Sequence, residues 1–449
     1  MPDPRSHATH NLPEPSRAYR WAVLLFISLA MFGNYYVYDS IAPVADLLSR
    51  DLGFKDADIG LLYSIYSIAA VVVLLIGGVI IDRAGTKRAT FLFAVICTIA
   101  GFITVAAPSL TVMACGRLLL GIGAEPMIVA ITTALAKWFK GKELSFAFGI
   151  NLTIARLGSW SADNSPSLAQ GLYTNWRDPL WLAAWIGATC IIGAGLYWIL
   201  ESRAEQRHRI GEAGETEKLV WADLYRFDKS YWYVVGLCVV FYSVVFPFRA
   251  FAIKFFIEAH GTSREAGGFL NSLLPLSAMI ATPLFGFLVD RVGRRSWFMA
   301  IGSAVLLPLF LVVAYAPPGD LVSVSLPWTQ PVAIPLTLLI VMSVLGIVFS
   351  LIPAIMWPSV AYIIEQRRLG SAYSVMTFCQ QIGMAAMPWT IGKLNDTFQA
   401  GQNNPQGYNP GLWLFTALAS LGLVFSFLLW RVETGPNAHG LETIKAGNN

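Results

Sequence analysis

Gly78-Val-Ile-Ile-Asp82-Arg83-Ala-Gly85-Thr-Lys87-Arg88 follows a long apolar segment, and 208 residues later Gly286-Phe-Leu-Val-Asp290-Arg291-Val-Gly293-Arg294-Arg295 follows another. Both stretches fit the pattern G-x-x-x-D-R-x-G-x-[KR]. Chance does not readily place such a pattern twice at matching positions of one chain. The repeat therefore indicates that the chain consists of two related halves.

The composition around this repeat indicates a membrane protein. The 449 residues are 56% hydrophobic and only 13% charged, whereas a soluble domain carries about 25% charged residues. A soluble protein of this size needs that charge to cover its surface. Most of this surface must therefore face lipid.

Apolar segments of about 20 residues, each long enough to cross a bilayer, recur along the whole chain. Backbone polar groups cannot stay unpaired in hydrocarbon, so these segments must be helices. We predict an all-α integral membrane protein with twelve transmembrane helices in two pseudo-symmetric six-helix bundles. The predicted spans lie near 21–44, 58–81, 89–107, 111–137, 143–168, 179–200, 228–257, 265–289, 296–316, 333–363, 369–392 and 411–431.

The Lys and Arg residues set the expected orientation. With the N-terminus inside, 22 of the 31 lie on the cytoplasmic side, five on the other side and four within spans. This asymmetry follows the positive-inside rule with both termini cytoplasmic, and it explains the basic character without a nucleic-acid partner. The expected parts are a tail at 1–20, bundles at 21–201 and 228–432, a cytoplasmic linker at 202–227 and a tail at 433–449.

Several kinds of site are excluded by residue placement. All five Cys residues lie in apolar segments and all five His residues in tails or loops. We therefore expect no disulfide framework, no metal site and no cofactor. No catalytic constellation and no nucleotide-binding G-x-x-x-x-G-K-[ST] stretch is found, so the chain is not expected to be an enzyme or an ATP-driven pump. The lipid bilayer is an expected partner, and no obligate protein partner is evident.

Two opposite charges lie at the same expected depth. Glu125 is close to the midpoint of span 111–137, and Arg156 is close to the midpoint of span 143–168. A charge at the bilayer centre costs about 2.5–3.5 kcal/mol, so it needs a partner or an aqueous cavity. Pro126 also removes a backbone donor beside Glu125. The pair suits a zwitterion, with the ammonium at Glu125 and the carboxylate at Arg156. An anion held by Arg156, a cation held by Glu125, and a purely structural ion pair remain alternatives.

Other charges within the spans have less certain roles. Asp39 and Arg117 both lie about 8–9 Å below the outer edge, which predicts a structural salt bridge between them; proton coupling is the alternative. Lys254 and Glu258 are four residues apart and are expected to form a local pair. Arg249 has no obvious partner in the sequence, so we expect it to face the cavity.

Aromatic residues are expected to flank the proposed cavity. Most membrane aromatics face lipid or the interface, but those expected to line the site are Tyr36, Tyr38, Tyr63, Tyr66 and Trp357.

In the repeated loop motif a glycine permits close helix packing, and each Asp can face the positive end of a neighbouring helix. The residues expected to act there in structure or gating are Gly78, Asp82, Arg83, Asp290 and Arg291. A simple topology anchor is the alternative.

The duplicated motif, together with Arg117-Leu-Leu-Leu-Gly121-Ile-Gly123, resembles the major facilitator superfamily over essentially the whole chain. This resemblance implies the major facilitator fold and transport by alternating access. It also implies that the loop motif latches one half against the other and releases when the cavity reverses.

Further stretches resemble the lysosomal dipeptide transporter branch of that superfamily. They are Tyr35-Tyr-Val-Tyr38-Asp39, Gly121-Ile-Gly-Ala-Glu125, Trp138-Phe-Lys-Gly-Lys-Glu143-Leu, Phe148-Gly-Ile-Asn-Leu-Thr-Ile-Ala-Arg156-Leu-Gly158 and Ile352-Pro-Ala-Ile-Met-Trp357-Pro-Ser359. The resemblance implies that Glu125 and Arg156 hold the two termini of a peptide, and that transport is uniport. Arg249 and the lack of an acidic dileucine-type signal in the N-terminal tail depart from the branch. We therefore expect a prokaryotic inner membrane.

Together these features predict a transporter of short peptides, dipeptides above all, that works by alternating access as a uniporter. Its substrate is expected to be a small molecule, either a short peptide or an amino-acid-like zwitterion. A proton-coupled carrier of small organic anions or drug-like solutes is the alternative, since Glu125 or Asp39 can supply a titrating carboxylate.

Overall fold

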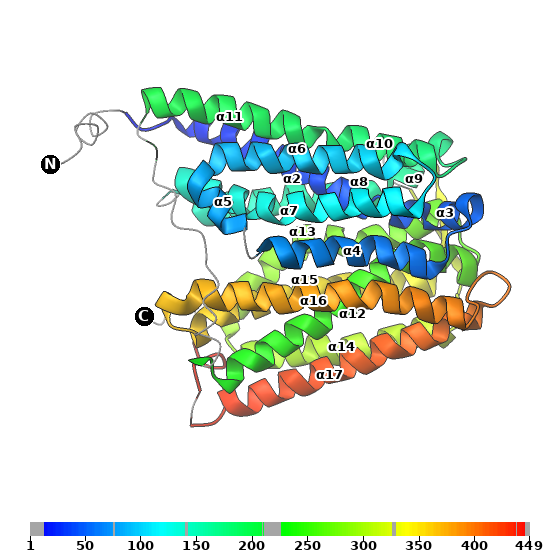
Figure 1. Ribbon diagram of the computed structural model, residues 1–449. Helices are drawn as coiled ribbons and strands as arrows, with labels where there is room; N and C mark the ends of the chain where they lie inside the picture. The colour runs from blue at the N-terminus through cyan, green and yellow to red at the C-terminus, as the bar shows by residue number, and fades with distance from the viewer. Residues whose placement is uncertain are drawn as a thin grey trace.

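The computed structural model describes residues 13–74, 77–139, 142–208, 210, 226–325, 329–436 and 438–444. Its long helices lie roughly parallel to one another (Figure 1). They are α2 (Arg17–Asp39), α4 (Asp56–Leu74), α6 (Thr86–Ala106), α7 (Leu110–Phe139), α8 (Leu144–Asp163), α11 (Thr189–Arg207), α12 (Lys229–His260), α13 (Arg264–Val292), α14 (Arg295–Tyr315), α15 (Leu336–Ile363), α16 (Leu369–Thr397) and α17 (Asn409–Glu433). Parts of the predicted tails and linker lie outside the described residues.

Shorter helices connect or extend these elements. They are η2 (Ala42–Val44), α3 (Ala45–Leu52), α5 (Gly77–Ala84), α9 (Ser165–Leu168), η3 (Gln170–Leu172), α10 (Arg177–Gly187), η5 (Gln366–Arg368) and η6 (Pro405–Tyr408). α2 begins and α17 ends at the same end of the bundle (Figure 1). We call this end the terminal end and the opposite one the far end. α3 and the start of α13 lie at the far end.

Ten segments of the described chain are long and apolar enough to cross a membrane. The predicted spans 143–168 and 369–392 correspond to α8 and α16, which are not among the ten. Both helices carry several polar residues, which lowers their hydropathy. The helical membrane fold is confirmed, whereas the count of twelve spans stays a prediction for these two helices.

Side-chain caps begin several of the long helices. The hydroxyl of Ser16 accepts a hydrogen bond from the backbone N–H of Tyr19 at 3.2 Å. A carboxylate oxygen of Asp228 accepts from Tyr231 at 3.0 Å at the start of α12. Such caps satisfy backbone donors that have no partner within the helix. They define where the spans at the start of each half begin.

The two halves of the chain meet through close helix contacts. α4 packs against α16, and α8 packs against α13. A Cβ atom on Gly60 would lie 2.2 Å from the carbonyl oxygen of Pro388, and one on Gly268 would lie 2.2 Å from that of Asp163. Both glycines therefore permit a backbone approach that no other residue allows. These contacts bring the two halves close together in this structure.

One feature of the fold was not predicted from the sequence. β1 (Leu321–Val324) and β2 (Val332–Pro335) form an antiparallel hairpin between α14 and α15, with Leu321 opposite Pro335. The sequence predicts a loop here, followed by the start of the span 333–363. Four-residue strands are too short to give a clear alternating pattern.

The two copies of the loop motif lie near the terminal end. Gly78, Asp82 and Arg83 belong to α5. In the second copy Asp290 pairs with Arg295 at 2.8 Å, and Arg291 lies 4.2 Å over the ring of Phe287. These positions are those of a helix-to-helix corner. The gating role of the motif stays a prediction.

The C-terminal residues fold back on the second copy of the motif. Glu442 Oε1 accepts from the backbone N–H of Ser296 at 2.9 Å and from its hydroxyl at 2.6 Å. Arg295, only 2% exposed, donates to the carbonyl oxygen of Ile444 at 2.8 Å. Leu441 is fully buried. The segment 438–444 is thus an integral part of the C-terminal half.

Candidate substrate-binding site

Glu125 lies in the middle of α7 and faces the other half of the molecule. Its Oε1 accepts two hydrogen bonds at 3.0 Å, from the hydroxyl of Tyr66 and from Nε2 of Gln381. Gln381 belongs to α16 in the C-terminal half. Among the described residues, no donor bonds the other carboxylate oxygen, Oε2. Glu125 is half-buried, so this oxygen remains for a ligand.

Arg156 lies on α8 between two aromatic rings. Its guanidinium carbon is 5.5 Å from the ring centre of Tyr35 and 5.5 Å from that of Phe349. Phe349 belongs to α15 in the C-terminal half. Within the described chain, the half-buried guanidinium has neither a hydrogen-bond acceptor nor an ion-pair partner. Its fork of N–H donors is available to a carboxylate.

These positions bear on the alternatives left open by the sequence. Glu125 and Arg156 both contact the opposite half, as expected for residues at a central interface. No ion pair joins them within the part of the chain that the structure describes. The alternative of a structural pair that locks α7 to α8 therefore gains no support.

Three of the predicted aromatic residues surround Arg117 instead of the open guanidinium of Arg156. The ring centres of Tyr38 and Tyr63 are each 5.2 Å from its guanidinium carbon, and that of Tyr66 is 5.9 Å away. Tyr66 also bonds Glu125, so it connects this aromatic cluster to the candidate site.

The predicted salt bridge between Asp39 and Arg117 is wrong. Arg117 is fully buried and donates to the carbonyl oxygens of Val37 at 3.1 Å, Tyr38 at 3.0 Å and Leu62 at 3.3 Å. Val37 and Tyr38 are in the last turn of α2, where carbonyls lack partners within the helix and the dipole is negative. The depth estimate was sound, but depth does not determine which way a side chain points around a helix.

The remaining predicted aromatics occupy different places. Tyr36 lies in a separate small cluster with Ala162 and Ala183, away from Glu125. Trp357 is half-buried, and its Nε1 donates to the hydroxyl of Tyr242 at 3.1 Å. Tyr242 stacks on Phe246 with ring centres 5.4 Å apart, and Phe246 contacts the ring of Phe349 beside Arg156. Trp357 is thus connected to the Arg156 side of the site.

Arg249, which was expected to face the cavity because the sequence shows no obvious partner, forms ion pairs with two carboxylates. Its guanidinium donates to Asp163 at 2.8 Å and to Asp39 at 3.3 Å. Both carboxylates belong to the N-terminal half, whereas Arg249 belongs to α12. Asp163 was not predicted as a site residue, although an ionisable residue within a predicted span is a sufficient signal. Asn271, which donates to Asp163 at 2.8 Å, was also missed.

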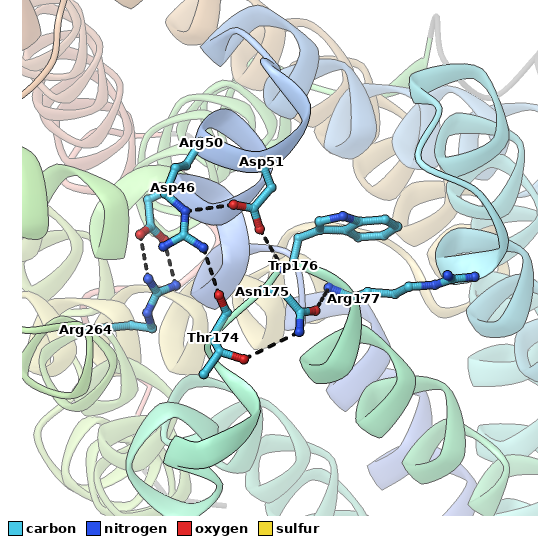
Figure 2. A network of polar contacts seen from close by, with 8 residues as sticks. All are labelled: Asp46, Arg50, Asp51, Thr174, Asn175, Trp176, Arg177 and Arg264. Carbon is cyan, nitrogen blue, oxygen red and sulfur yellow. Dashed lines mark hydrogen bonds and ion pairs between the residues drawn. The ribbon is translucent and has the colours of Figure 1, made fainter.

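Further ion pairs join the halves towards the far end. Lys254 on α12 pairs with Asp56 at the start of α4, and it lies 3.8 Å from Glu258, the predicted local partner. Arg264, at the start of α13, forms two hydrogen bonds with Asp46 of α3, at 2.7 and 2.8 Å (Figure 2).

The surface around the last pair is also ordered by polar contacts. Arg50 donates to the carbonyl oxygen of Thr174 at 2.9 Å, and Asp51 accepts from the backbone N–H of Trp176 at 3.1 Å (Figure 2). In each cross-half pair the cation belongs to the C-terminal half and the carboxylate to the N-terminal half. The far end is therefore closed by a layer of complementary charge.

At the terminal end, some ion pairs join residues of the same half. Lys137 pairs with Glu201 at 2.8 Å within the N-terminal half. His439 lies 2.8 Å from both Asp228 and Glu433 within the C-terminal half.

The chain was compared with known proteins. The family model for the Major Facilitator Superfamily matches residues 27–388 and 248–447. The lysosomal dipeptide transporter MFSD1 of Homo sapiens is 31% identical over 445 residues, covering 94% of this chain and 88% of that protein. The probable sulfoacetate transporter SauU of Cupriavidus necator is 23% identical, covering 64% of this chain and 69% of that protein.

Solved structures share the fold. A bacterial homolog of the human lysosomal transporter Spinster has a TM-score of 0.73 at 18% identity, covering 93% of this chain and 98% of that one. The nucleoside transporter NupG has a TM-score of 0.65 at 17% identity, with 92% and 99% covered. The family match and the identity to MFSD1 over nearly the whole chain agree with the helical architecture. The chain is a membrane transporter, not an enzyme, and belongs to the major facilitator superfamily.

Proposed function

We propose that the protein carries short peptides, chiefly dipeptides, across the membrane as a uniporter. The observation that carries this proposal is that the guanidinium of Arg156 has no acceptor among the described residues. A half-buried guanidinium between aromatic rings of both halves, with no acceptor among the described residues, is a costly arrangement unless a ligand supplies one. A peptide carboxylate supplies two oxygens that match its fork.

Glu125 provides the other end of the proposed site. Its Oε2 remains for a ligand, while Tyr66 and Gln381 hold Oε1. An ammonium group is the natural partner of a carboxylate in a site shielded from water. A zwitterion that engages both residues leaves neither charge unpaired. The similarity to relatives named as dipeptide transporters supports the same substrate class.

Closure of the far end supports alternating access in this chain. With both termini in the cytoplasm, as the Lys and Arg distribution favours, the closed far end faces the outside. Outward opening then requires the separation of Arg249 from Asp163 and of Lys254 from Asp56. We propose the plasma membrane of a prokaryote as the location, although relatives that are 31–32% identical are named lysosomal dipeptide transporters.

A carrier of small organic anions is the second candidate. Arg156 alone suits a single carboxylate or sulfonate, and a relative at 23% identity is named a probable sulfoacetate transporter. Such a carrier makes no use of Glu125 as an ammonium site. Replacement of Glu125 with Gln thus leaves its transport largely intact.

Uptake into proteoliposomes tests the proposal. Purified protein is reconstituted, and entry of radiolabelled L-alanyl-L-alanine is followed with and without an imposed proton gradient. Uniport predicts uptake that runs down the dipeptide gradient and is not driven by protons. Uptake of acetate or sulfoacetate in place of the dipeptide favours the second candidate. Accumulation against the dipeptide gradient when protons are supplied contradicts uniport.

A further inference from the structure

Gln381 presents an unused acceptor beside Glu125. Its side chain is buried, with the residue only 3% exposed. Nε2 donates to Glu125 Oε1 at 3.0 Å. Because an ionised carboxylate can only accept, the amide must turn its nitrogen towards Glu125 and its oxygen elsewhere. That oxygen, Oε1, is buried and has no hydrogen-bond partner within the described chain.

A buried acceptor without a donor is rare in folded proteins and calls for a partner. The amide of Gln381 is fixed by its bond to Glu125, so it cannot turn to find another donor without losing that bond. A ligand group with several N–H donors, bound at Glu125, is the partner that both residues share. An ammonium group has three such donors.

We propose that Gln381 Oε1 accepts a hydrogen bond from the N-terminal ammonium of the substrate, and that Gln381 selects for peptides with a free amino terminus. This inference rests on the proposed function. The ammonium donates one N–H to Glu125 Oε2 and a second to Gln381 Oε1. An acetylated terminus has one N–H and no charge, so it cannot serve both acceptors.

The location of Gln381 gives the contact a second consequence. Glu125 belongs to the N-terminal half and Gln381 to the C-terminal half, so a bound ammonium is held by both halves together. A substrate recognised in this way favours the state in which the halves close around it. The contact therefore contributes to substrate-dependent closure as well as to affinity.

Gln381→Met tests the inference, because methionine has a similar length and forms no comparable hydrogen bond. Binding of L-alanyl-L-alanine and of propionyl-L-alanine, which lacks only the amino group, is measured by calorimetry. We expect the dissociation constant of the dipeptide to rise about 10-fold or more, as for the loss of a hydrogen bond to a charged group. The affinity for propionyl-L-alanine should remain within about 2-fold of the wild type.

Gln380→Met is the matched control. Gln380 precedes Gln381 on α16 and donates to the sulfur of Met384 at 3.6 Å, away from Glu125. This variant should bind the dipeptide as the wild type does. If Gln381→Met does not fold, Gln381→Asn keeps the amide but shortens its reach, and it should weaken dipeptide binding by a similar factor.

Several results overturn the inference. Equal weakening of the dipeptide and of propionyl-L-alanine indicates a purely structural role for Gln381. An unchanged dissociation constant for the dipeptide excludes the contact altogether. If the wild type binds no dipeptide, the proposed function itself is wrong. If Glu125→Gln abolishes the preference for a free amine while Gln381→Met preserves it, only the role of Gln381 is wrong.

Discussion

Arg249 donates to Asp163 at 2.8 Å from the opposite half of the molecule, and their side chains are 4% and 0% exposed. A second carboxylate, that of Asp39, lies 3.3 Å from the same guanidinium. One cation from the C-terminal half therefore holds two anions of the N-terminal half. Opening of the far end must break this group and expose all three charges to water.

Arg249→Met should shift the protein towards a state that is open at the far end. Removal of one partner from a buried ion pair costs about 3–5 kcal/mol, because it leaves an unpaired buried charge. Here it leaves two carboxylates close together. Spin labels at Leu172 and Gln402, which are exposed at the far end in opposite halves, should show a longer distance than in the wild type.

These labels need a background in which exposed Cys115 is replaced by Ser. Arg177→Met is the matched control, since Arg177 is exposed and its guanidinium donates to the carbonyl oxygen of Ala106 in its own half at 3.4 Å. It should leave the distance unchanged. An unchanged distance in Arg249→Met as well contradicts the role of this group in closure.

Asp39 should be coupled energetically more strongly to Arg249, which it contacts, than to Arg117, which bonds backbone carbonyls. Two double-mutant cycles on thermal stability measure the coupling energy of each pair. They combine Asp39→Asn with Arg249→Met and with Arg117→Met. Contacting charges typically give a coupling of about 0.5–3 kcal/mol, and independent sites add within about 0.5 kcal/mol. A larger coupling for Arg117 than for Arg249 contradicts the pairing seen in the structure.

Glu442→Ala should destabilise the C-terminal half without altering substrate preference. Glu442 accepts from the backbone N–H of Ser296 in the first turn of α14, so it acts as a cap supplied by the tail. Loss of a helix cap costs about 0.5–2 kcal/mol. The melting temperature of the purified protein measures the effect. Thr443→Ala, one residue along, should leave it unchanged; an equal loss in both variants contradicts the capping role.

Arg156→Lys should lose dipeptide binding even though the charge is kept. An ammonium cannot reproduce the planar fork that holds a carboxylate with two bonds, and it stacks less well between Tyr35 and Phe349. Calorimetry with L-alanyl-L-alanine gives the dissociation constant. A value close to that of the wild type shows that Arg156 acts only as a point charge, or not at all.

Much of the fold follows from local sequence features. Hydropathy alone identifies ten spans, because lipid demands a continuous apolar surface on each one. α8 and α16 are less apolar, and they carry Arg156 and Gln381 at the interface between the halves. The repeated loop motif then relates the two halves. These features require no knowledge of which helices touch.

The contacts of single side chains were less predictable. Counting residues along each helix predicts a common depth for Glu125 and Arg156, and both residues contact the opposite half. The partner of Asp39 could not be predicted in this way, because Arg249 is 210 residues away in the other half and depth carries no information about direction around a helix. Gln381 is uncharged, so the sequence did not mark it as a site residue. Only its contact with Glu125 in the structure identifies it as one.

The central claim is that Glu125 and Arg156 hold the two ends of a zwitterionic peptide. The most direct test is thermal stabilisation of the purified protein by L-alanyl-L-alanine, its N-acetylated form and its C-terminal amide, because a specific ligand raises the melting temperature by mass action. We predict that the free dipeptide raises the melting temperature with increasing concentration, and that either blocked form raises it much less at the same concentration. Stabilisation by simple monocarboxylates or lipophilic cations, with none by the dipeptide, would contradict the account.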